Sequence, residues 1–380
     1  MNNTYPFLDL KAVNARYEEE LIAAATRVIK SGRYIGGEEV DKFEQELCDM
    51  TGAAYAVGVS NGLDALRLIL RAYKELGIMT DGDEVIVPGN TYIASVLAIT
   101  DAGLTPVLVD PSLTTFNIDT AKIEKAVTPR TRAIMTVHLY GRTAWDETMA
   151  EIARKYGLKI IEDSAQAIGA CSVALGMDGK GRRAGALGHA SAFSFYPTKN
   201  VGALGDAGAV TTSDNELAKA VRALANYGSD RRYHNIYVGA NCRLDPMQAA
   251  MLRIKLGHTA EENADRFARA LAYHRTINHE AIICPMMSES VTDNVWHQYV
   301  IRVTGGKRDE FRDKLLKHGV ATDVHYAVPP HRQPCYQNLK HGPLPVTELL
   351  ANEVVSLPIG TGTSVKDAAT IAEIINSIEF

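Results

Sequence analysis

The sequence predicts an α/β protein with two parts: a large three-layer α/β/α domain with a mostly parallel, mixed sheet, and a smaller C-terminal α+β domain. From about Tyr55 onward, short β-rich runs alternate with amphipathic helical stretches, which is typical of βαβ units. After about residue 213, long helical stretches follow one another closely, and the tail mixes strands with helices. The length of 380 residues also favours two domains over one.

The elements of the large domain follow in order along the chain. Strands are predicted at 54–60, 83–88, 105–110, 132–141, 158–163 and 191–197. Helices are predicted between them at 61–76, 90–103, 120–127 and 145–157. In the first of these helices Leu66, Ile69, Leu70 and Tyr73 recur at helical spacing, and the second ends on Gly103, a typical helix stop.

The second half of the chain begins with three helical stretches, at 215–228, 246–256 and 259–279, the last of which is long enough to connect two lobes. An alternating strand, a helix, a strand-like run and a closing helix then predict a compact α+β unit; they lie at 294–304, 307–319, 321–326 and 365–378. We therefore predict two domains, with the boundary near residue 256; they span 1–256 and 257–380.

Composition excludes several classes of protein. The chain has 46% hydrophobic and 22% charged residues and a net charge of −5, which gives no basic footprint for nucleic acid. No secretory signal is visible at the start, and the apolar runs are too short to span a bilayer. The five cysteines are scattered and never spaced as a metal or disulfide motif. We expect a soluble cytoplasmic protein without a metal site or a membrane partner.

Three positions at predicted strand ends carry candidate chemistry. The turn Ser60-Asn61-Gly62 opens a helix, whose free N–H groups and positive dipole end suit a phosphate, although Asn-Gly is also a common turn. Asp163 ends a strand, where it is either a helix N-cap or an anion facing a cationic nitrogen. Lys199 follows a strand and a proline; it is either a solvated loop lysine or a nucleophile for an aldehyde.

Together these three positions meet the needs of pyridoxal 5'-phosphate. The cofactor requires an anion seat, a carboxylate for the ring nitrogen that keeps the ring an electron sink, and a lysine for its aldehyde. Lys199, once released by an amino substrate, would be the natural base for the proton shift of a transamination. The order of the elements supports this set, but their spacing alone leaves the alternatives open.

Four segments make the chain resemble a known family. "PGNTYIAS", "EDSAQAIGA", "SFYPTKN" with "VGALGDAGAV", and "GANCRLDPMQAA" occur in this order. They are similar to the DegT/StrS family of sugar-nucleotide aminotransferases, which depend on pyridoxal phosphate and have fold type I. The resemblance runs over nearly the whole chain and is highly specific when the segments are taken together.

The resemblance implies roles for individual residues around the cofactor ring. Lys199 would be the lysine that bonds to the cofactor, and Asp163 the partner of the pyridine nitrogen. Gln166 would contact the side of the ring that carries the phenolic oxygen. Tyr92 aligns with the aromatic residue that stacks on the ring, although a lone tyrosine at such a position is more often core.

The resemblance also implies how the phosphate and the substrate are held. Backbone N–H groups of Gly62 and Leu63 and the Ser194 hydroxyl would bind the phosphate. Asn241 would reach it from the neighbouring subunit, so that the active site belongs to a homodimer. His325 and Tyr326 would approach the sugar.

Two features depart from the family pattern. Ala327 replaces the proline that commonly follows "HY", so the loop is predicted to be less rigid. The segment 171–185 is longer and more basic than the usual loop; Lys180, Arg182 and Arg183 either touch the substrate's diphosphate or, the alternative we favour, face solvent.

The resemblance favours transamination of a dTDP-3-keto-6-deoxyhexose to the 3-amino-3,6-dideoxyhexose, with L-glutamate as amino donor. The alternative within the class is amination at C4 or of a UDP-linked sugar. From other classes, a non-catalytic regulator would lack Lys199 or Asp163, and both are present. A dinucleotide-binding oxidoreductase would need G-x-G-x-x-G at a helix start, which "VSNGLDAL" lacks.

Overall fold

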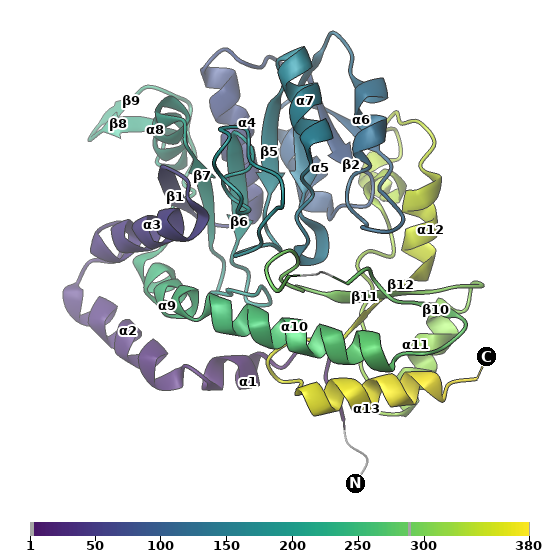
Figure 1. Cartoon of the computed structure of the whole chain (residues 1–380). Helices are drawn as coiled ribbons and strands as arrows, with labels where there is room; N and C mark the ends of the chain where they lie inside the picture. The colour runs from purple at the N-terminus through teal and green to yellow at the C-terminus, as the bar shows by residue number, and fades with distance from the viewer. Residues whose placement is uncertain (1–3, 288–289, 380) are drawn as a thin grey trace.

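A seven-stranded mixed sheet forms the centre of the larger part of the computed structural model, which describes residues 4–287 and 290–379 (Figure 1). The strand order is β1-β7-β6-β5-β4-β2-β3, and β7 runs in the direction opposite to the other six strands of this sheet. The strands are β1 (Tyr55–Val59), β2 (Glu84–Pro88), β3 (Thr105–Val109), β4 (Thr131–Val137), β5 (Lys159–Asp163), β6 (Ala190–Ser194) and β7 (Gly208–Thr212). The predicted fold class is therefore confirmed.

Helices cover both faces of this sheet because side chains alternate along each strand. On β5, Ile161 joins the apolar core beneath α4, α5 and α8, whereas Ile160 joins a separate core beneath α6 and α7. The bounds of these helices are α4 (Gly62–Glu75), α5 (Ile93–Asp101), α6 (Thr120–Ala126), α7 (Glu147–Tyr156) and α8 (Asn215–Ala225). Polar residues such as Asp146 and Asp214 cap their N-termini by accepting backbone N–H bonds.

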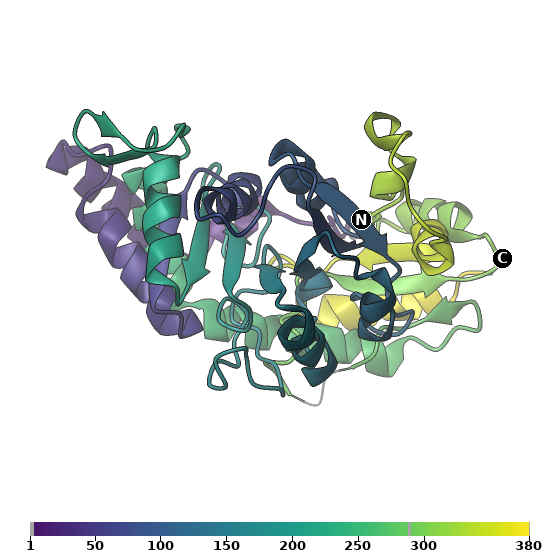
Figure 2. The ribbon, with the colours of Figure 1, turned by 90° about the horizontal axis from the view of Figure 1, so that it is seen from above.

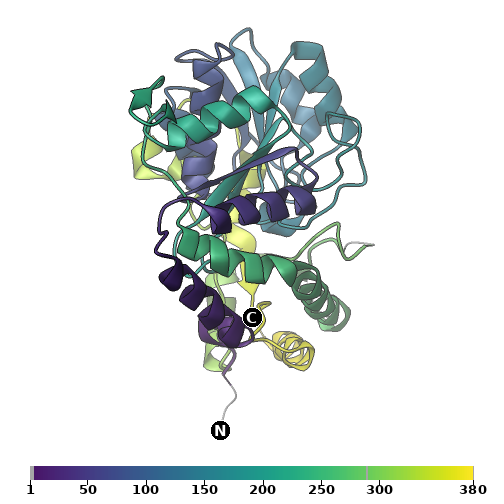
Figure 3. The same cartoon turned by 90° about the vertical axis from the view of Figure 1, so that its left-hand side faces the viewer.

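Further helices surround the sheet. α2 and α3 lie against α9 (Figure 3), and β8 and β9 form a hairpin at the end of the molecule opposite the C-terminal core (Figure 2). Their bounds are α1 (Leu10–Ala15), α2 (Glu18–Ser31), α3 (Glu38–Thr51), α9 (Pro246–Gly257), β8 (Ser229–Arg231) and β9 (His234–Asn235). In the described chain, no helix is both long enough and apolar enough to cross a membrane.

A second apolar core lies around a three-stranded antiparallel sheet near the C-terminus. α10 and α13 run side by side along it (Figure 1). The elements of this part are α10 (Thr259–Thr276), β10 (Ile282–Ile283), β11 (Tyr299–Val303), α11 (Arg308–Lys317), α12 (Pro345–Glu353), β12 (Val354–Leu357) and α13 (Val365–Asn376), with short 3-10 turns at Pro330–Arg332 and Pro334–Tyr336. Another 3-10 turn, Leu139–Gly141, follows β4 of the large sheet. The domain boundary after residue 256 stays a prediction.

The prediction of a strand at 321–326 is wrong. Only a single bridge, between Asp323 and Ser356, forms there, because the chain turns away directly afterwards. The edge of the small sheet is instead taken by β12, which pairs with β11.

Candidate active site

The candidate residues gather at one edge of the large sheet. β1, β2, β4, β5 and β6 all point the same way, since β1 and β6 are each antiparallel to β7. Their carboxyl ends therefore meet at one edge, where ligands of open α/β sheets bind. Asp163 and Ser194 end their strands there, and Gly62 begins the helix that follows β1.

Lys199 lies half-buried in the loop between β6 and β7, and not on the open surface. Burial lowers the pKa of its amine to about 8, although the charge of Asp163 acts in the opposite direction. Within the described residues, no carboxylate forms an ion pair with this lysine. An amine in this environment is partly uncharged near neutral pH, as a nucleophile or a base requires.

Asp163 is only 7% exposed and is held by two donors. Ser95 Oγ donates to its Oδ2 at 2.8 Å, and the Ala165 N–H donates to its Oδ1 at 3.2 Å. Because the single hydroxyl proton of Ser95 is used on Asp163, Thr91 must donate in the Thr91–Ser95 contact of 2.7 Å. These contacts fix the carboxylate in position, and its charge acts on Lys199.

Gln166 connects Asp163's segment to the aromatic residues of the site. Its Oε1 accepts the Tyr140 N–H at 2.6 Å, so its amide Nε2 is free to donate to the Tyr326 hydroxyl at 3.1 Å. The ring of Tyr92 lies 5.2 Å from that of Tyr326 and is 55% exposed. Tyr92 therefore offers an open aromatic face at the site and is not part of the core.

The predicted anion seat has a tight backbone cradle. Asn61 caps α4 by accepting the Asp64 N–H at 2.8 Å, which leaves the N–H groups of Gly62 and Leu63 at the helix start. A Cβ at Gly62 would stand 2.6 Å from the Ser194 Cβ, so only glycine allows this approach. Two backbone donors and a serine hydroxyl therefore converge, as a bound phosphate requires.

The other predicted residues occupy different surroundings. His325 is held by its Nδ1 contact of 2.8 Å to Ser356 Oγ, and its carbonyl accepts the Tyr140 hydroxyl. Asn241 is exposed, and in the described chain it has no hydrogen bond or ion pair with Gly62 or Lys199. The single chain thus brings the cofactor residues together, and the segment that carries Asn241 runs beside the anion seat, where the Cys242 carbonyl accepts the Ser60 N–H at 3.1 Å.

The structure also shows how far the neighbours of Lys199 and the basic residues of the segment 171–185 are exposed. Phe195 is a core residue, 1% exposed, whereas Tyr196 is 52% exposed. In the segment 171–185, Lys180, Arg182 and Arg183 are exposed, and Arg183 donates to the Met50 carbonyl at 2.6 Å. Ala327 is exposed as well.

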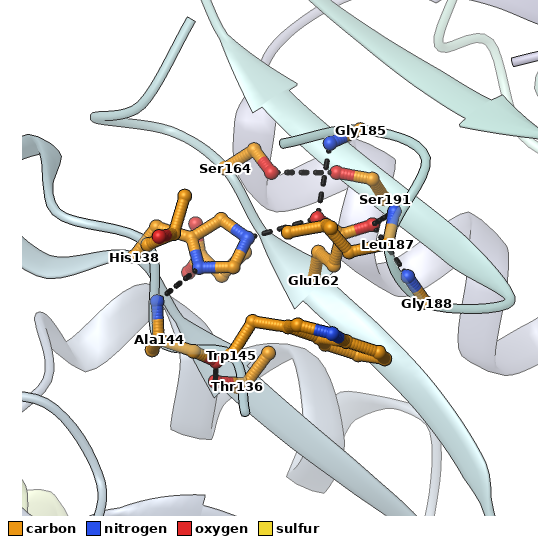
Figure 4. A network of polar contacts seen from close by, with 12 residues as sticks. Thr136, His138, Ala144, Trp145, Glu162, Ser164, Gly185, Leu187, Gly188 and Ser191 are labelled. Carbon is orange, nitrogen blue, oxygen red and sulfur yellow. Dashed lines mark hydrogen bonds and ion pairs between the residues drawn. The ribbon is translucent and has the colours of Figure 1, made fainter. Parts of the chain in front are cut away.

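Sequence reasoning missed a buried network beside Asp163 (Figure 4). Glu162, fully buried, receives His138 Nε2 at 2.8 Å together with three backbone N–H groups, those of Gly185, Leu187 and Gly188. Because His138 Nδ1 accepts the Ala144 N–H at 2.9 Å, its proton lies on Nε2 and is donated to Glu162. The sequence did contain a signal for this network, the adjacent acids in "IIED". Side chains alternate along a strand, so two neighbouring acids lie on opposite faces of the sheet and only one of them can face the site.

The fold and this site define an α/β enzyme that presents a lysine, a carboxylate and an anion seat at one sheet edge. The model of the DegT/DnrJ/EryC1/StrS aminotransferase family matches residues 15–376. A relative from Aneurinibacillus thermoaerophilus, dTDP-3-amino-3,6-dideoxy-alpha-D-galactopyranose transaminase, is 47% identical over 371 residues, covering 98% of both chains. The chain therefore belongs to the DegT/DnrJ/EryC1/StrS aminotransferase family, and the predicted family and enzyme class are confirmed.

Solved structures agree with this assignment. The structure of S. venezuelae DesV in complex with a ketimine intermediate is 44% identical, covers 98% of both chains and has a TM-score of 0.91. The structure of NtdA from Bacillus subtilis with bound cofactor PMP is 30% identical, covers 99% of this chain and 87% of that one, and has a TM-score of 0.88.

Proposed function

We propose that this protein is a pyridoxal 5'-phosphate-dependent aminotransferase that converts a dTDP-3-keto-6-deoxyhexose to the 3-amino-3,6-dideoxyhexose, with L-glutamate as amino donor. The observation that carries the proposal is the juxtaposition of Lys199, whose pKa is lowered to about 8, with the buried carboxylate of Asp163. The enzyme would act in the cytoplasm, as two domains that meet after residue 256.

The residues present fit the cofactor. Gly62 and Leu63 N–H groups with the Ser194 hydroxyl would hold its phosphate, and Asp163 would face its ring nitrogen. When bound, the cofactor supplies an electron sink for the carbon that loses a proton. Lys199 holds and moves that proton at Nζ, which its lowered pKa allows near neutral pH. Gln166 and Tyr92 would orient the ring from its edge and its face.

Support for the sugar comes from the relatives. The relative from A. thermoaerophilus is named for a dTDP-linked 3-amino-3,6-dideoxy sugar, and it matches nearly the full length of this chain. His325 and Tyr326, at the edge of the small core, would contact the sugar. The alternative is amination at C4 or a UDP-linked substrate, and the second experiment below distinguishes it from amination at C3 of the dTDP sugar.

A homodimer would complete the site. Asn241 is exposed and follows the β8–β9 hairpin; exposed apolar residues lie on the hairpin and directly after it, among them Tyr233 at 88% and Val238 at 85%. Several exposed apolar side chains on one short segment are a candidate for a protein interface. We propose that a second copy covers this hairpin and that Asn241 of each copy contributes to the phosphate seat of the other.

The first experiment tests the lysine. Purified protein should show the absorbance band of lysine-bound cofactor, and borohydride should abolish it. Lys199→Ala should remove the band and lower kcat by at least ~10³-fold, since the residue that forms the covalent bond and moves the proton is lost. Lys255→Met is the matched control, because burial also lowers the pKa of Lys255 to about 8. A Lys199→Ala protein that kept the band at the same site would contradict the proposal.

The second experiment tests the substrate. Protein and glutamate are incubated with dTDP- and UDP-linked 3-keto and 4-keto sugars, and products are identified by mass and NMR. The proposal expects amination at C3 of the dTDP sugar. A product aminated at C4, or a preference for the UDP sugar, would replace this substrate with the alternative.

A further inference from the structure

The side-chain amide of Asn200, the residue after Lys199, forms hydrogen bonds with three partners. Its Nδ2 donates to Asn263 Oδ1 and to the Val295 carbonyl, both at 3.0 Å. The Asn263 amide is oriented in turn, because its own Nδ2 donates to the Ile168 carbonyl at 3.1 Å. With both N–H bonds of Asn200 committed, its Oδ1 is left only as an acceptor.

The third partner is His297, which is 5% exposed and lies just before β11. Its Nδ1 stands 3.0 Å from Asn200 Oδ1. Because that oxygen can only accept, Nδ1 must carry a proton, and in the neutral ring Nε2 then has a lone pair. Burial, followed by the charges of Lys199, Arg266 and His325, lowers the pKa of His297 well below its usual range, so the ring is neutral at neutral pH.

These contacts hold the loop directly beside Lys199, whereas Lys255 and Gln248 hold it further on: Lys255 Nζ donates to the Gly202 carbonyl at 2.6 Å, and Gln248 Oε1 accepts the Leu204 N–H at 2.9 Å. The Lys199 N–H bonds to the Tyr196 carbonyl within the loop, at 2.8 Å. On one side the loop borders a cavity lined by Leu8, Tyr17 and Arg266, among others. Asn200 therefore provides the side-chain link from the lysine loop to α10 and to the segment that enters β11.

We propose that His297 is a positioning residue for Lys199. It acts through Asn200, because the Nδ1–H of His297 donates the hydrogen bond that holds the Asn200 side chain. The inference rests on the proposed function for its catalytic meaning. Its structural claim concerns Lys199 itself and holds for the protein without cofactor. A lysine loop that loses this bond moves and admits water, and misplacement by about 1 Å can cost ~10²-fold in rate.

Water entry would change the titration of Lys199. The charge that acts on Lys199 is that of Asp163, which raises the pKa of the lysine. The charges that act on His297 are those of Lys199, Arg266 and His325, and all three lower its pKa. Burial is the largest effect on the Lys199 pKa and sets it at about 8 instead of 10.5. Loss of burial would therefore move the pKa upward.

Two substitutions of His297 separate its ring nitrogens. Asparagine places an amide donor near the position of Nδ1, whereas glutamine places it near Nε2. His297→Asn should therefore keep the bond to Asn200, and His297→Gln should lose it. Asn200→Ala removes the same link from the other side and serves if a His297 variant does not fold.

The measurement uses cofactor-free protein. An amine-reactive label is applied across pH, and the labelled Lys199 peptide is quantified by mass spectrometry. Wild type and His297→Asn should show a midpoint at about 8, while His297→Gln and Asn200→Ala should titrate higher and label about threefold more slowly at pH 8. In the loaded enzyme kcat should fall ~10–100-fold for those two variants, with the KM for glutamate little changed.

Equal midpoints in all variants would overturn the proposal, and so would a His297→Asn protein that behaves worse than His297→Gln. A cooperative thermal unfolding transition of each variant shows that the variant is folded before its labelling midpoint is compared with that of the wild type. Because the labelling needs no substrate, a wild-type protein that aminates none of the sugars would contradict the proposed function without affecting this result.

Discussion

Glu162 and Asp163 are neighbours at the end of β5, both carboxylates and both buried, yet they lie in different surroundings. Glu162 points to the face covered by the segment before β6, where four donors saturate its two oxygens (Figure 4). Asp163 points to the other face, receives two donors and acts on Lys199 by its charge. A carboxylate whose acceptor sites are all hydrogen-bonded to the protein stabilises the fold, whereas a carboxylate with unused acceptor sites is available to bind a ligand.

The largest expected effect concerns Asp163. Asp163→Asn keeps the shape of the side chain but removes the negative charge that would hold a protonated ring nitrogen. We expect kcat to fall by ~10³-fold or more while the free energy of unfolding of the cofactor-free protein changes by less than about 1 kcal/mol. Steady-state kinetics and urea unfolding measure the two quantities. An active Asp163→Asn enzyme would remove the distinction between the two acids.

Glu162→Gln should do the reverse. The new NH2 group replaces an oxygen that accepts two donors, so buried N–H groups face one another. At about 1–3 kcal/mol for each lost partner, we expect a loss of about 3 kcal/mol in the free energy of unfolding. Urea unfolding checks it, and limited proteolysis should cut the segment 171–188 more readily.

His138 provides the control for that prediction, since it donates to Glu162 from within the same network. His138→Gln places an amide donor near Nε2 and loses only the contact with the Ala144 N–H, so it should cost less than Glu162→Gln, which disturbs two donors. Stability unchanged by Glu162→Gln would mean that the network is not what holds this segment.

Sequence could predict much of this arrangement, and its limits have physical reasons. The strand-end rule and the family motifs pointed to Asp163, Lys199 and Gly62, and the structure places all three at the same edge of the sheet. Strand alternation implies that Glu162 turns away, but its donors come from a loop whose path depends on tertiary packing. His297 lies almost a hundred positions from Asn200, so no local pattern joins them.

The smallest effect tests how the two acids act on the lysine. Asp163 raises the pKa of Lys199 against the larger lowering by burial, and the balance is about 8. Below that pH the amine is charged, and above it the amine is free to react. Asp163→Asn removes the favourable charge, so the midpoint of Lys199 labelling in cofactor-free protein should fall below about 8. Glu162→Gln should leave the midpoint where it is, because the charges that act on Lys199 include Asp163 and not Glu162. A midpoint that moved equally in both variants would mean that the acids share the electrostatic role, and that the faces of β5 are less separate than their contacts indicate.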